Sequence, residues 1–106
     1  MSMQDEHPND AVNVAPHLHE VLFEDDKLRV LKVTVNPGDI ADMHWHPYNI
    51  NYVLNGGRLR FDKSDGSSVE VDLTKGQVTS SSEGSHTVEN VGDSMVETVQ
   101  VELKGA

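Results

Sequence analysis

The sequence predicts an all-β domain, a sandwich or barrel of about eight or nine short strands. Three observations lead to this prediction. Valine is the commonest apolar residue, and its β-branched side chain favours strands over helices. Turn-forming residues recur at regular intervals, as they do in sandwiches and barrels. After residue 20, no segment shows the i, i+3, i+4, i+7 apolar spacing of an amphipathic helix.

Residues 1–20 are expected to form an N-terminal arm ahead of the domain. The first 16 residues are polar and contain two prolines, which is typical of a mobile terminus. An arm that packs on a partner subunit is the alternative interpretation. His17 and His19 form a His-x-His pattern, but no glycine frames the pair and it lies at the entrance to the domain. A surface or subunit-packing role is therefore favoured for this pair over a metal-ligand role.

The remaining chain divides into strand-like segments separated by turns. Leu28–Val35 has apolar residues at both parities, so part of this strand is expected to be covered on both faces. Near the C-terminus, valines and a leucine alternate with polar residues, as in a strand with two unlike faces. The domain is expected to span residues 21–104, with residues 105–106 as a tail. The expected strands are residues 21–23, 28–35, 40–46, 51–54, 58–61, 69–73, 77–82, 86–91 and 95–103.

Composition excludes several functional classes. The 106 residues suffice for one domain. With 18 acidic residues against 8 basic ones, the net charge of −10 argues against nucleic acids and anionic membranes as partners, since both need a basic surface. There is no cysteine, so any metal ligand must be a histidine, a carboxylate or an amide. Neither a membrane-length apolar run nor a secretory signal is visible, so a cytoplasmic location is expected.

The pair His44 and His46 carries the strongest chemical signal in the chain. Side chains two residues apart on a strand point to the same side. Two imidazoles on one face of one strand make half of a metal site. Gly38 precedes the pair and Gly56-Gly57 follows it.

This stretch resembles the first motif of the cupin family, G-x5-H-x-H-x(3,4)-E-x6-G. Gly38, His44 and His46 stand at the motif's spacing, and Gly56-Gly57 stands one or two residues before the closing glycine. Asn51 occupies the position of the glutamate.

A second stretch, residues 76–90, resembles the second cupin motif, G-x5-P-x-G-x2-H-x3-N. Gly76, Gly84, His86 and Asn90 match by residue type. Ser82 replaces the proline, and the spacing from Gly84 to His86 is one residue short. The resemblance covers about residues 21–104. Two motifs in order and at the usual separation are more specific than either alone.

The resemblance implies a cupin-type jelly roll, the double-stranded β-helix barrel. It also implies that His44, His46 and His86 bind one divalent transition metal: Fe, Ni, Zn, Mn or Cu. Asn51 is then a candidate fourth ligand or water-orienting residue, or neither. Three neutral histidines leave the metal charge uncompensated, so a small anionic ligand is expected at the open positions. Small cupins usually pair, so a homodimer is expected.

Three functions stay open at this stage. One is a metal-dependent dioxygenase of the non-haem iron type, since some thiol dioxygenases of the cupin superfamily also use three histidines. The others are a non-catalytic binding or sensing module and a structural cupin. No catalytic residue is assigned, and no carboxylate is expected on the inner faces near the histidines. The expected pocket residues are Tyr48, Ile50, Val53, Val78, Ser80 and Val88.

Overall fold

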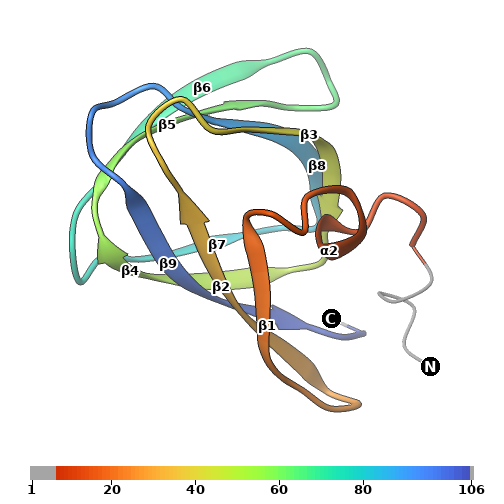
Figure 1. Ribbon diagram of the computed structural model, residues 1–106. Coiled ribbons are helices and arrows are strands. Elements are labelled where there is room, and N and C mark those ends of the chain that lie inside the picture. Colours follow the sequence, from red (N-terminus) through yellow and green to blue (C-terminus); the bar gives the residue numbers. More distant parts are fainter. Residues whose placement is uncertain (1–6, 106) are drawn as a thin grey trace.

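Two antiparallel sheets face each other and curve into a barrel (Figure 1). The computed structural model describes residues 7–105, and in that part of the chain the all-β prediction is confirmed. The five-stranded sheet has the order β1-β2-β9-β4-β7 and the four-stranded sheet the order β3-β8-β5-β6. The strands are β1 His19–Glu24, β2 Leu28–Val35, β3 Ile40–His46, β4 Asn49–Asn55, β5 Gly57–Asp62, β6 Ser68–Leu73, β7 Val78–Ser81, β8 Gly84–Asn90 and β9 Val96–Leu103.

Glycines permit the turns at which the two motif stretches begin. Gly38, before β3, has a φ of +85° and Gly76, before β7, has a φ of +85°. L-residues rarely adopt this left-handed conformation, whereas glycine does so without steric cost. The backbone amide of Gly38 also donates to the carbonyl oxygen of Asn90, 3.1 Å away. The first residue of one motif therefore contacts the last residue of the other.

The segment before β1 packs on the barrel of its own chain. Asp10 caps the short helix α2, Ala11–Val14, by accepting a hydrogen bond from the Val12 amide. Ala15 and Leu18 belong to the buried apolar cluster. Helix α2 lies against β3 (Figure 1), and the backbone amide of Trp45 donates to the Asn9 carbonyl.

For residues 7–20, this packing differs from the expected mobile or partner-packing arm. Residues 7–20 do not project from the domain, because their few apolar side chains complete its core and their backbone extends along edge strand β3. Strand β1 also begins at His19, before the expected boundary at residue 21. Residues 1–6 lie outside the described residues, as does Ala106 of the expected tail.

The barrel interior is divided into an apolar part and a polar part. One cluster contains Leu59, Val88 and Val96 among other apolar residues. Buried polar residues are as numerous as buried apolar ones, although charged groups are rarely buried unless paired. The interior therefore contains a site as well as a core. The buried polar residues are Asp10, His19, Arg29, His44, His46, Asn49, Asn90, Thr98, Gln100 and Glu102.

Strand β9 turns its polar face inward. Thr98, Gln100 and Glu102 are buried, while the alternating Val99 and Val101 lie on the outer face. The first half of the neighbouring strand β4 behaves in the same way, with Asn49 and Asn51 inward and Ile50 and Tyr52 outward, whereas Val53 is buried. Strand β9 and the first half of β4 thus present hydrogen-bonding groups to the interior, beside the buried apolar residues Leu31 and Val35 of β2.

No helix among the described residues is long and apolar enough to cross a membrane.

Candidate metal centre

Four imidazoles gather inside the barrel from three strands. His19 comes from β1, His44 and His46 from β3, and His86 from β8. The His44 ring centroid lies 4.9 Å from those of both His46 and His86, and 5.3 Å from that of His19. The coordinating atoms of His19, His44 and His46 all lie within 4.8 Å of one another. Histidines this close, with their nitrogens converging, could hold a single metal ion.

A β-bulge aims the two histidines of β3 into the barrel. The pairing of β3 with β8 shifts between Ala41 and His44, so both residues face inward although their numbers differ in parity. The extra residue of a bulge redirects the side chains that follow it. After the bulge, His44 stands directly opposite His86 on β8.

The hydrogen bonds of three histidines leave the Nε2 atoms free to coordinate. His44 Nδ1 donates to the Asp42 carbonyl at 2.7 Å, and His19 Nδ1 to the Ala15 carbonyl at 2.9 Å. A carbonyl oxygen can only accept, so each Nδ1 carries the proton and each Nε2 keeps its lone pair. His46 Nδ1 lies 2.6 Å from the Glu102 carboxylate. Metal-binding histidines in general have their second nitrogen held in this way.

The Nε2 atom of His44 is the strongest indication that this cluster binds a metal. It is fully buried and has no hydrogen-bond partner. Leaving such an acceptor without a partner costs about 1–3 kcal/mol. A metal ion bound to its lone pair would remove that cost.

His19 is the residue that sequence reasoning missed. The sequence favours a surface or subunit-packing role for His17 and His19, yet His19 is buried at 5% exposure while His17 is exposed. Strand alternation would place His17 and His19 on the same side of the chain. Strand β1 begins only at His19, so this alternation does not apply to His17. The His19 ring is brought to the centre by pairing of β1 with β2, a contact that no local pattern specifies.

A buried ion-pair network stands behind His46. Arg29 Nε and Nη2 donate to Glu102 Oε1 at 2.8 and 2.6 Å. Arg29 Nη2 also donates to both carboxylate oxygens of Asp10, at 2.9 and 3.0 Å. The network connects the cap of helix α2 to the candidate metal centre. It also corrects the expectation that no inward carboxylate lies near the histidines.

Burial keeps the imidazoles neutral. It lowers the pKa of His19 to about 4 and the pKa values of His46 and His86 to about 3. Burial also lowers the pKa of His44. The same desolvation raises the pKa of the Glu102 carboxyl, which the positive charge of Arg29 opposes. Neutral imidazole is the form that coordinates a metal, so at neutral pH these residues need lose no proton to bind one.

These pKa values predict that the metal-free protein loses stability on acidification. The folded pKa values lie below the unfolded value of about 6.5, so the unfolded state binds more protons in the interval between them. Stability is complete above about pH 6.5 and falls as the pH drops. At pH 5, the lowered pKa values of His19 and His46 should each reduce the free energy of unfolding by about 2 kcal/mol, at 1.36 kcal/mol per pH unit. The urea midpoint of the metal-free protein, measured from pH 7 to pH 5, checks this. The exposed His17→Gln variant should retain the pH dependence, and a flat midpoint in the wild type would contradict it.

A cavity of about 560 Å³ adjoins the histidines. One part of its wall is apolar and includes Val53, Phe61 and Val88. Another part is polar: it has the amides of Asn49, Asn51 and Gln100, the hydroxyl of Thr98, and the run Thr79, Ser80, Ser81 and Ser82. The cavity can therefore hold a small molecule with both an apolar and a polar portion beside a metal.

Some of the expected pocket residues line the cavity and others do not. Val53, Ser80, Val88 and Asn51 line the cavity. Asn51 Nδ2 donates to Asn49 Oδ1 at 2.8 Å.

Three other expected pocket residues, Tyr48, Ile50 and Val78, do not line this cavity. Strand β4 begins at Asn49, so Ile50 alternates to the outside at 37% exposure, and Val78 is 62% exposed at the start of β7. Tyr48 accepts the Leu103 amide through its carbonyl oxygen.

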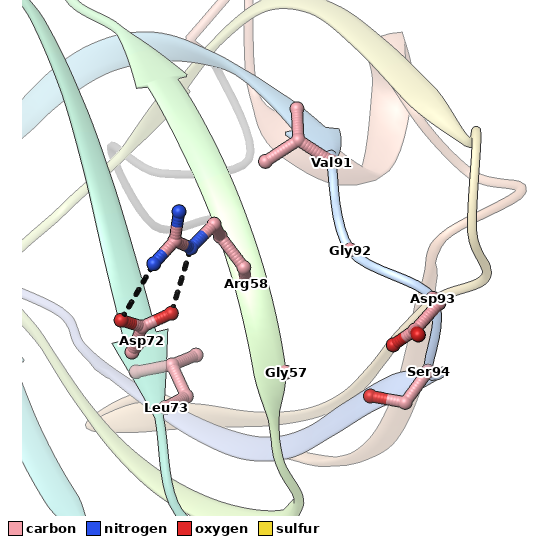
Figure 2. A pocket seen from close by; sticks show the side chains of 8 residues that line it. All are labelled: Gly57, Arg58, Asp72, Leu73, Val91, Gly92, Asp93 and Ser94. Carbon is pink, nitrogen blue, oxygen red and sulfur yellow. Dashed lines mark hydrogen bonds and ion pairs between the residues drawn. The ribbon is translucent and has the colours of Figure 1, made fainter.

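A second hollow, of about 620 Å³, has no comparable chemistry. Figure 2 shows Arg58 of β5 paired with Asp72 of β6 at its edge, with Val91, Gly92, Asp93 and Ser94 across from them. The Arg58–Asp72 ion pair is exposed to solvent, and no histidine lines the hollow. The histidine cluster is therefore the candidate functional site.

Comparison with known proteins supports the architecture. No protein-family model matches the chain, and no curated protein matches its sequence. Among solved structures, a cupin domain from Bordetella pertussis Tohama I is 26% identical, with a TM-score of 0.75 over 83% of this chain and 93% of that one.

Two more distant structures show the same fold. A protein with a double-stranded β-helix domain from Klebsiella pneumoniae is 21% identical, with a TM-score of 0.67 over 83% of this chain and 76% of that one. A cupin family protein from Methanocaldococcus jannaschii is 12% identical, with a TM-score of 0.66 over 82% of this chain and 79% of that one.

Proposed function

Because this chain is a small cupin with the double-stranded β-helix fold, we propose that it binds one divalent transition metal in its barrel. The observation that carries the proposal is the buried, unpartnered Nε2 of His44 among imidazoles whose Nδ1 atoms are held elsewhere. His44 and His46 are the central ligands, and His19 and His86 complete the set. Imidazole suits Fe, Ni, Cu and Zn, and Mn is a further candidate.

The electrostatics of the site favour an anionic ligand. The proposed ligands are neutral, so the metal charge is met only indirectly, through Glu102 behind His46. An incoming carboxylate or thiolate would complete the compensation at an open coordination position. The cavity beside the histidines provides the volume for such a small molecule.

Among activities, we propose oxygenation of a small anionic substrate. Bound iron would supply the activation of oxygen and substrate. The protein's part is to hold the imidazoles through Ala15, Asp42 and Glu102, to bind substrate in the cavity and to exclude bulk water. The alternative is a binding, sensing or structural module without turnover. It is supported by the cavity wall, where the buried polar residues besides the histidines are amides and a threonine, and the carboxylate of the lining, Glu83, belongs to an exposed residue.

Metal analysis tests the proposal. Protein purified without chelator should contain about one transition metal per chain by mass spectrometry, and it should rebind metal after chelation. Absence of binding for every one of the five candidate metals would refute the proposed centre. Oxygen consumption by iron-loaded protein with small thiols, diketones and organic acids then separates turnover from binding alone.

A homodimer is also part of the proposal. The outer face of the five-stranded sheet carries an unbroken apolar row, since Phe23, Val30, Val101 and Ile50 are consecutive partners across four strands. Phe23 and Ile50 are exposed. A second copy with the same face could cover this row by isologous packing. A solution mass of twice 11.7 kDa by light scattering would support it. The net charge of −10 supports the absence of nucleic-acid and anionic-membrane partners. A cytoplasmic location stays a proposal from the sequence.

A further inference from the structure

We infer that Asn49, Asn51 and Gln100 form a subsite that selects ligands carrying a hydrogen-bond donor. The ligand class is a small organic acid with a hydroxyl or ammonium group at the end away from the acid. Binding of the acid end of this ligand depends on the proposed metal function. Binding of the donor end depends only on the amides. These residues lie on β4 and β9 of the sheet that faces β3 and β8.

A single backbone carbonyl determines the orientation of all three amides. Asn49 Nδ2 donates to the Pro47 carbonyl oxygen at 2.9 Å. Because that oxygen can only accept, Asn49 must turn its NH₂ group toward it and its Oδ1 toward the neighbouring amides. Asn49 Oδ1 then accepts from Asn51 Nδ2 at 2.8 Å and from Gln100 Nε2 at 3.2 Å.

The consequence is an unmet, buried acceptor on a residue that lines the cavity. Gln100 turns its nitrogen toward Asn49, so its Oε1 is left without a partner. The residue is only 7% exposed and lines the cavity. Buried acceptors of this kind are rare in folded proteins because an unmade hydrogen bond is costly. Rotating the amide would not help, because it would place two oxygens against each other at Asn49.

A ligand donor is the group that complements this wall. The histidines offer lone pairs and suit a metal, and Gln100 offers an oxygen and suits a hydroxyl or ammonium hydrogen. Apolar residues such as Val53 and Phe61 line the same cavity and suit a short alkyl segment. The wall therefore matches a molecule with an acid, a short carbon chain and a terminal donor. A ligand that buries a methyl group against Gln100 would leave the oxygen unsatisfied.

Matched ligand pairs test the inference in the full-length, metal-loaded protein. The pairs are glycolate and propanoate, 3-hydroxypropanoate and butanoate, and 4-hydroxybutyrate and pentanoate. Each pair differs only in a hydroxyl or methyl terminus, and 4-aminobutyrate supplies the ammonium arm. By calorimetry, the donor-bearing member of the best-fitting pair should bind about tenfold more tightly, the effect of one hydrogen bond to a buried acceptor. Comparing the affinities of 4-hydroxybutyrate and 4-aminobutyrate with that of pentanoate shows which donor, hydroxyl or ammonium, the subsite prefers.

Variants connect the preference to the amide. Methionine has a volume similar to that of glutamine but no amide oxygen. In Gln100→Met, the two members of each ligand pair should therefore bind with equal affinity, and the affinity for the alkyl acid should be retained. Gln77→Met, the same chemical change at an exposed residue that does not line the cavity, should leave the preference intact. The wild-type comparison does not require either variant to fold. Equal binding within every pair, or no binding of any of these acids, would overturn the inference.

Failure of the metal centre gives a different result. If the protein binds no metal, 1-butanol and methyl propyl ether can be compared in the metal-free protein by NMR titration. These neutral probes differ in the donor and need no metal. A preference for the alcohol that Gln100→Met abolishes supports the amide subsite even then, and equal binding of the two overturns it.

Discussion

Replacing His19 with alanine is expected to weaken metal binding by about 100-fold or more, because loss of a ligand exceeds the 10- to 100-fold effect of its supporting residues. His19 is the candidate ligand that only the structure identifies, and its coordinating atom lies within 4.8 Å of those of His44 and His46. Its Nδ1 is held by the Ala15 carbonyl, so the ring is preoriented. Competition titration against a chromophoric chelator measures the change in metal dissociation constant.

The chain contains a matched control two residues away. His17 is exposed and contacts the Ile40 carbonyl rather than the cluster. His17→Ala should therefore leave the dissociation constant unchanged. Equal effects of the two substitutions would indicate loose surface binding and exclude His19 as a specific ligand. His86→Ala should weaken binding as His19→Ala does if both histidines belong to the first coordination shell, and unchanged metal content in that variant would remove His86 from the site.

Replacing Arg29 with methionine is expected to destabilise the folded protein by about 3–5 kcal/mol. Methionine retains the volume and apolar stem of the side chain but leaves the carboxylates of Asp10 and Glu102 buried without the guanidinium between them. Like charges in a low-dielectric interior repel strongly when their counter-ion is removed. Urea unfolding followed by circular dichroism measures the loss of free energy.

Two comparisons separate this mechanism from general damage. Arg58→Met breaks an ion pair of similar geometry with Asp72, but Arg58 is 52% exposed, so solvent compensates and little stability should be lost. Adding Asp10→Asn to Arg29→Met should recover part of the stability, because one buried charge is removed. A double variant less stable than Arg29→Met alone would show that hydrogen bonding, rather than charge repulsion, dominates in the network.

The network gives the N-terminal segment a part in the proposed site. Asp10 caps helix α2 and binds Arg29, Arg29 binds Glu102, and Glu102 accepts from His46. Ala15, at the end of the same helix, holds His19. The segment expected to be a mobile or partner-packing arm therefore supports two of the four histidines.

Local patterns in the sequence were sufficient for the all-β class and for the pair of histidines on β3. Strand alternation and turn chemistry act over a few residues, so β2 and β3 have the boundaries that their residues predict. His44 and His46 share a face for the same local reason. His86 was reached through the resemblance of residues 76–90 to a known motif, and the structure places it opposite His44.

Only the tertiary structure decided which face of each strand points inward and which distant residues meet. Alternation in β9 separates Val99 and Val101 from Gln100 and Glu102, but the inward choice depends on partners: Arg29 lies 73 residues away from Glu102 in sequence. The same applies to His19, which reaches the centre through pairing of β1 with β2. A period of two residues establishes two faces, whereas burial of a charge requires a counter-charge supplied by another element. The sequence by itself therefore determined the all-β class and, through its two motif resemblances, the barrel and the candidate ligands His44, His46 and His86. Long-range packing decided the place of His19, Glu102 and Gln100.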